Sequence, residues 1–179
     1  MLSEFFSSVS VVGFSGSRQP GGAVSSVALF GALAAVPAGA QVVVGCAAGV
    51  DAVVRLACPH AQVFLVASGQ FGQGKSAFAR RSIACVQSVA AAGSGGLWVS
   101  FPASACPAGL LSSASSSKCF SGSGSGTWAS LALAVGLGVR ALVFLPAGVE
   151  CPAGWGFEPL PGLKGWFSSV RAPVQLSLL

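Results

Sequence analysis

QVVVGCAAGVDAVVRLAC, residues 41–58, holds a strand pattern, a glycine-rich turn and a helix pattern in direct succession. Its first part, QVVVGC, is an apolar run that predicts a strand, and GVDAVVRLAC predicts a short helix that Pro59 ends. A continuously apolar strand is typical of a parallel sheet that helices cover on both faces. The stretch therefore indicates an α/β fold, provided that the same unit recurs along the chain.

The alternation of strand and helix patterns does recur on both sides of this unit. Strands are predicted at 9–14, 41–46, 62–67, 97–102 and 140–146, and helices at 23–36, 49–58, 76–93 and 126–138. A long Pro- and Ser-rich loop is predicted at 103–123. The pattern predicts an α/β, Rossmann-like three-layer sandwich with a mostly parallel sheet over 1–148. We expect 149–179 to be a C-terminal tail that packs on the domain or on a partner.

The composition favours a folded chain with few ionisable groups. Charged residues make up 7% and hydrophobic residues 53% of the 179 residues, whereas disordered chains combine low hydrophobicity with high charge. Gly, Pro and Ser clusters interrupt the long uncharged stretches, and Arg140 interrupts the most apolar run. We therefore expect no membrane span, and a membrane-associated structural protein is the alternative. The start, MLSEFFSS, has no basic leader pattern, which predicts a cytoplasmic protein.

Cysteine and charge patterns restrict the chemistry further. The six cysteines are scattered without a CxxC pair, and His60 is the single histidine. These features predict reduced thiols and no metal site. A net charge of +5 favours an anionic partner such as a nucleotide or nucleic acid. The apolar helices at 23–36 and 126–138, with Trp155 and Trp166, indicate surplus apolar surface and thus a homo-oligomer.

Three loops of small residues follow predicted strands at the edge where parallel α/β sheets bind ligands. GFSGSR offers glycine amides and Arg18 to an anion, or is an ordinary surface turn. The loop GCAAGVD brings Asp51, the single aspartate, into the first turn of a helix. Asp51 is there either as an acceptor for a ligand or as a stabiliser of the helix dipole. SGSGSGTW places Thr127, the single threonine, at a helix start, or is a flexible linker.

A basic segment, GQGKSAFARRS, lies between the second and third of these loops, and its Phe78 would suit base stacking. Together the segments predict one shared phosphate-binding site and no cofactor. The predicted ligand-binding residues are Gly13, Ser15, Gly16, Ser17, Arg18, Gly45, Gly49, Asp51, Lys75, Arg80, Arg81, Ser123, Gly124, Ser125, Gly126 and Thr127.

In this order, the motifs resemble the SLOG superfamily, the Rossmann-like group that contains the DNA-processing protein DprA and the LOG nucleotide hydrolases. VVGFSGSR is similar to the family's first strand and its G-S-R loop, and VVVGCAAGVDAVVR to the DprA segment S-G-x-A-x-G-I-D. FARRSIA, at 78–84, resembles F-P-x-R-N-R-I-I-A-G without its Asn and one Arg. SGSGTWASLALAVGLGVRALVFLPAG is similar to S-G-S-x-x-T-A and to the LOG signature P-G-G-x-G-T-x-x-E. The resemblance covers roughly residues 9–148.

The resemblance implies a non-catalytic domain that binds a phosphate-bearing ligand, with single-stranded nucleic acid as the DprA-like partner. A SLOG-type sensor of a nucleotide or nucleotide derivative is one alternative. The catalytic Glu of the LOG hydrolases would fall at Ser130, and no other acid lies nearby in sequence. A LOG-like nucleoside monophosphate phosphoribohydrolase is therefore the less favoured alternative, and no catalytic residue is predicted.

Overall fold

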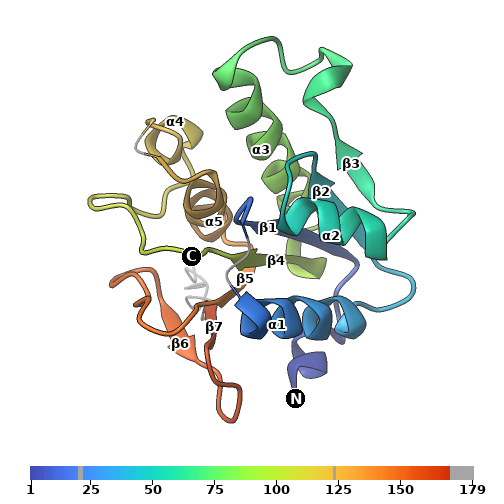
Figure 1. The fold of residues 1–179 in the computed structure, drawn as a ribbon, viewed down its shortest axis with the longest axis vertical. Helices are drawn as coiled ribbons and strands as arrows, with labels where there is room; N and C mark the ends of the chain where they lie inside the picture. The colour runs from blue at the N-terminus through green and yellow to red at the C-terminus, as the bar shows by residue number, and fades with distance from the viewer. Residues whose placement is uncertain (20–21, 123, 170–179) are drawn as a thin grey trace, which may run out of the picture.

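The computed structural model describes residues 1–19, 22–122 and 124–169. In these residues, seven strands form one sheet in the order β3-β2-β1-β4-β5-β7-β6 (Figure 1). The strands are β1 (Val11–Gly16), β2 (Gln41–Gly45), β3 (Gln62–Phe64), β4 (Gly96–Phe101), β5 (Arg140–Phe144), β6 (Phe157–Pro159) and β7 (Trp166–Ser169). Strands β1 to β5 pair in parallel, whereas β7 pairs antiparallel with β5 and β6. The predicted α/β fold with a mostly parallel sheet is confirmed.

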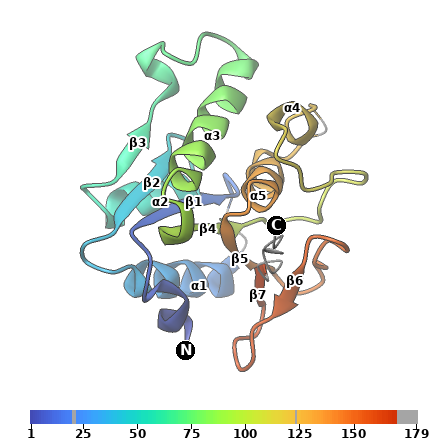
Figure 2. The same cartoon turned by 180° about the vertical axis from the view of Figure 1, so that it is seen from behind.

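Helices pack on both faces of this sheet. The helices of the described chain are α1 (Gly22–Ala35), α2 (Val50–Ala57), α3 (Lys75–Ala90), α4 (Ser116–Cys119), which packs on α5, and α5 (Gly126–Gly136), with 3₁₀ turns at Leu2–Phe6, Val66–Ser68 and Gly93–Gly95. One buried core joins α1 and α2 to the first face, and a second core joins α3 and α5 to the other (Figures 1 and 2). The three layers of the predicted Rossmann-like sandwich are therefore present.

The alternation of side chains along the two central strands determines what each face receives. On β1, Val12 and Phe14 belong to the core under α1 and α2, so Ser15 points to the opposite face. On β4, Trp98 belongs to the core under α3 and α5, and Ser100 shares its face. Small polar side chains of two neighbouring strands thus meet on the α3–α5 side, near the carboxyl ends of the strands.

The end of the described chain differs from the sequence expectation. The pattern predicted no strand after 146, but β7 extends the sheet beyond β5, and β6 forms its last strand. Trp166 packs edge-on against Phe101 and Phe144, with ring centroids 5.6 and 5.4 Å away. A strand as short as β7 has too few residues to show a hydrophobic period. The packing of Trp166 against the two phenylalanine rings stabilises it in the sheet. Residues 170–179 of the predicted tail lie outside the described residues.

The apolar surface is distributed differently on the two helices that were expected to expose it. Helix α5 is buried, with Trp128, Leu131 and Leu133 at most 1% exposed. On α1, Val27 and Phe30 are 72% and 57% exposed. In the described ranges, no helix has both the length and the apolar character that a membrane span needs.

Candidate functional site

A cavity of about 660 Å³ lies at the carboxyl ends of β1 and β4. From β1 the chain continues through α1 toward β2, and from β4 it continues through α5 toward β5, so the two loops diverge. Such a switch point in strand order is where open parallel sheets bind their ligands. The predicted site residues that line the cavity are Ser15, Gly16, Ser17, Arg18, Asp51, Lys75, Arg81, Gly124, Ser125, Gly126 and Thr127.

Four predicted residues, Gly13, Gly45, Gly49 and Arg80, are not among the lining residues, and Ser123 lies outside the described residues. Arg80 is exposed, and its guanidinium donates to the Phe71 carbonyl at 2.7 Å and to the Ser76 hydroxyl at 3.0 Å. These bonds tie Arg80 to the loop before α3. Arg80 and Arg81, which the sequence treats as one basic pair, therefore have different surroundings.

Gly45 and Gly49 hold segments close together rather than facing the cavity. A Cβ at Gly45 would overlap Nη1 of Arg81, so only glycine admits the guanidinium there. Gly49 has φ +72°, and a Cβ would collide with the backbone of Ser17 and Arg18. The amide of Val50 donates to the Ser17 carbonyl at 3.1 Å across the same crossing. Gly49 thus lets the first two predicted loops pack against each other, and Gly45 lets Arg81 of α3 reach the second loop.

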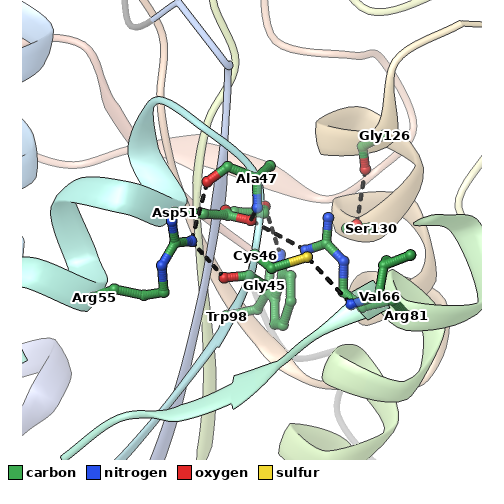
Figure 3. A network of polar contacts seen from close by, with 11 residues as sticks. Gly45, Cys46, Ala47, Asp51, Arg55, Val66, Arg81, Trp98, Gly126 and Ser130 are labelled. Carbon is green, nitrogen blue, oxygen red and sulfur yellow. Dashed lines mark hydrogen bonds and ion pairs between the residues drawn. The ribbon is translucent and has the colours of Figure 1, made fainter. Parts of the chain in front are cut away.

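The second loop is organised by what we name the ion-pair network: the side chains of Asp51, Arg55 and Arg81 with the backbone of Gly45 and Ala47 (Figure 3). Asp51 Oδ2 lies 3.1 Å from Arg81 Nη1 and accepts the Ala47 amide at 3.1 Å. Arg55 Nη1 donates to the Gly45 and Ala47 carbonyls at 2.9 and 3.0 Å. Asp51 and Arg81 are 4% and 8% exposed. The network neutralises its own buried charges.

The start of α5 is organised in the opposite way. We name Gly124, Ser125, Gly126 and Thr127 the glycine–serine turn. Ser125 Oγ caps the helix weakly by accepting the Trp128 amide at 3.4 Å. The amides of Gly126 and Thr127 and the Thr127 hydroxyl have no hydrogen-bond partner in the described part of the chain. These donors line the cavity and lie at the positive end of the helix dipole, which favours an anion.

Two exposed cations lie beside these donors. The Arg18 guanidinium stacks 5.6 Å from the centre of the Phe78 ring, and Lys75 lies at the first residue of α3. Within the described ranges, neither forms an ion pair with an acidic group. Asp51, the one carboxylate among the described lining residues, is already paired with Arg81. The cavity therefore presents uncompensated positive charge.

Several lining residues were not predicted. Ser82, Ser104 and Phe120 also face the cavity. Phe120 follows α4 in the Ser-rich segment that was predicted only as a loop, where a lone aromatic was the available signal. Ser104 accepts the Trp128 indole N–H at its carbonyl, 2.9 Å away, which fixes the loop after β4 against α5. No sequence pattern marks that contact, because the two residues come from different segments.

The thiols are all free in the described chain, and burial determines their ionisation. Burial raises the pKa of Cys85 from its ordinary value of 9.0 to about 12, although the neighbouring Arg81 partly lowers it. Burial also raises the pKa of Cys151 to about 11. Neutral thiols of this kind pack as small apolar groups. In the described ranges, no three His, Cys, Asp or Glu side chains gather into a metal-binding group.

Comparisons were made with protein-family models, with curated proteins and with solved structures. None of the three found a match to this chain.

Proposed function

We propose that this chain is a binding domain that holds a nucleoside phosphate in the cavity at the carboxyl ends of β1 and β4. One observation supports it most: donors of the glycine–serine turn and the cations Arg18 and Lys75, which have no hydrogen-bond or ion-pair partner respectively among the described residues, face the same cavity. Helix-start amides together with cations bind phosphate oxygens. The ion-pair network contributes Ala47, Asp51 and Arg81 to the lining of the same cavity.

The size and walls of the cavity favour one nucleotide unit. Small-molecule cavities span roughly 300–1,000 Å³, and this cavity of about 660 Å³ falls within that range. Phe78 and Phe120 supply aromatic faces from two different elements. An aromatic face stacks any nucleobase without strong sequence preference. We therefore expect the phosphate at the glycine–serine turn and the base against an aromatic ring.

The nucleoside phosphate has two possible sources. The resemblance to DprA favours single-stranded nucleic acid, and exposed Arg80 and Lys118, each adjacent in sequence to a lining residue, would suit a backbone that continues past the cavity. A free nucleotide, the ligand that a sensor would bind, would fit inside the cavity and would need no contacts beyond it. Both sources use the same anion site, so one experiment with two ligands separates them.

Hydrolysis of the ligand is not part of this proposal. Ser130, at the position of the LOG catalytic Glu, is 2% exposed, and its hydroxyl donates to the Gly126 carbonyl at 2.8 Å (Figure 3). Asp51 is held by Arg81 and the Ala47 amide. A general acid or base needs a titratable group that can reach the ligand, and neither side chain is arranged for this role.

The test is equilibrium binding of adenosine 5′-monophosphate and of a fluorescent oligothymidylate to the full chain, over a range of salt concentrations. The double variant Arg18→Ala, Lys75→Ala should weaken binding of the preferred ligand at least about ten-fold and lower the salt slope by about one to two. Lys164→Ala is the matched control, since it removes one exposed cation that does not line the cavity. Saturable binding of neither ligand, or equal losses in the control, would overturn the proposal.

A further inference from the structure

Two serine hydroxyls and an indole form a buried cluster beneath the cavity. Ser15 on β1 and Ser100 on β4 face each other in register, and their Oγ atoms are 2.7 Å apart. Trp98 Nε1 lies 3.2 Å from the first and 3.1 Å from the second. A Cβ at Gly13 would overlap the Trp98 ring, so this glycine provides the space for the indole. We name Ser15 and Ser100 the hydroxyl pair.

One hydrogen of this cluster has no acceptor among the described residues. The cluster has three polar hydrogens, one from the indole and one from each hydroxyl. The indole hydrogen is directed at the two oxygens, and one hydroxyl hydrogen occupies the bond between them. The remaining hydroxyl hydrogen has no acceptor among the described residues. One member of the hydroxyl pair must therefore point its hydrogen elsewhere.

Burial decides which member this is. Ser100 is 0% exposed, whereas Ser15 is 8% exposed and lines the cavity. If Ser15 donated to Ser100, the free hydrogen would be sealed in the core, where an unmet donor is costly. If Ser100 donates to Ser15, the free hydrogen belongs to Ser15 and can reach the cavity. The second arrangement leaves no buried donor without a partner.

We infer that Ser15 is a specificity-determining residue whose hydroxyl donates into the cavity and selects a phosphate oxygen of the ligand. Trp98 and Ser100 are positioning residues, because they use the acceptor capacity of the Ser15 oxygen and so orient its hydrogen. A phosphate oxygen accepts this hydrogen, whereas an ammonium or amide N–H at the same place would meet a donor. The inference rests on the proposed function, because it assigns a contact within that site.

The experiment compares adenosine 5′-monophosphate with adenosine, by calorimetry on the full chain and on three variants. Ser15→Ala removes the donor and should weaken binding of the monophosphate about ten-fold, since a hydrogen bond to a charged group is lost. Adenosine binding should change less than about two-fold, because the nucleoside lacks the phosphate oxygen. A purely structural role of Ser15 would weaken both ligands alike.

The other two variants act as matched tests. Ser100→Ala alters the other member of the same hydroxyl pair, but Ser15 keeps its hydrogen, so the monophosphate should lose no more than about three-fold. Ser15→Cys keeps a side chain of similar size but offers only a weak donor, so its affinity for the monophosphate should fall as it does in Ser15→Ala. The melting temperatures of the two variants show whether either has also lost stability. Wild-type binding of the monophosphate with unchanged affinity in both Ser15 variants would overturn this inference alone. If the wild-type chain binds none of the three ligands, adenosine 5′-monophosphate, adenosine and oligothymidylate, both the proposed function and this inference are overturned.

Discussion

The ion-pair network and the glycine–serine turn lie on the same cavity, but they satisfy their polar groups differently. In the network, Asp51 Oδ2 and Arg55 Nη1 each contact two partners from the chain itself. In the turn, the amides of Gly126 and Thr127 have none within the described ranges. Lining a cavity is therefore not the same as being available to a ligand. The first region should control stability, and the second should control binding.

Arg81→Met should produce the largest effect, because it leaves the buried Asp51 carboxylate without its cation. Removing one partner of a buried pair costs about 3–5 kcal/mol of unfolding free energy. Urea denaturation followed by circular dichroism measures this loss. Arg80→Met is the matched control, since Arg80 is exposed and has no ion pair in the described chain, and the loss of its two exposed hydrogen bonds should cost about 1 kcal/mol or less. Equal stability of the two variants would show that the buried Asp51–Arg81 ion pair does not control the stability of the fold.

Gly49→Ala should have the next largest effect. Its φ of +72° disfavours a side chain, and the added Cβ would press on the backbone of Ser17 and Arg18. A strained backbone position of this kind costs about 1–3 kcal/mol. Gly126→Ala is the comparison within the glycine–serine turn, because a Cβ there meets no atom. Its unfolding free energy should change by less than about 0.5 kcal/mol, and a larger loss would show that the turn is as tightly packed as the network.

The stability of the chain at alkaline pH should report on how well the region around Cys85, next to the ion-pair network, excludes water. Burial raises the pKa of the Cys85 thiol from its ordinary value of 9.0 to about 12, so the unfolded chain loses this proton first as the pH rises. Its contribution to stability is complete below pH 9 and falls between pH 9 and 12 by up to about 1.4 kcal/mol per pH unit. Urea denaturation at pH 8 and 10 measures this slope. Cys85→Ala should reduce the slope, and the part that remains comes from other buried thiols such as Cys151, whose pKa is also raised. Cys58→Ala should leave most of the slope, and an unchanged slope in Cys85→Ala would show that other groups cause it.

Thr127→Val should give the smallest change in stability and a clear change in binding. Valine keeps the shape of threonine but removes a hydroxyl that has no partner in the described chain. The unfolding free energy should change by less than about 0.5 kcal/mol. Affinity for adenosine 5′-monophosphate should fall about five-fold, as expected for one lost hydrogen bond. A loss of stability without a loss of affinity would show that the Thr127 hydroxyl supports the fold and does not bind the ligand.

The sequence was most informative where a pattern is local. Arg81 carries such a signal, because it lies four residues from both Ala77 and Cys85 and so falls on the buried stripe of α3. Arg80 is one residue away and faces solvent. Helical spacing could therefore have separated the two arginines, whereas the basic composition of the segment grouped them. Gly13, predicted to bind ligand, makes room for Trp98 instead, and no local pattern marks a partner that is 85 residues away.

By itself, the sequence determined the alternation of strands and helices, the parallel sheet and the placement of small-residue loops at one edge. These features follow from hydrophobic periodicity and from glycine, which act within a few residues. The tertiary structure alone decided which polar groups are already paired. Asp51 meets Arg81 across 30 residues, and Ser15 meets Ser100 across 85. Strand order and helix packing create these pairs, and within the described ranges they leave the amides of Gly126 and Thr127 in the glycine–serine turn without partners.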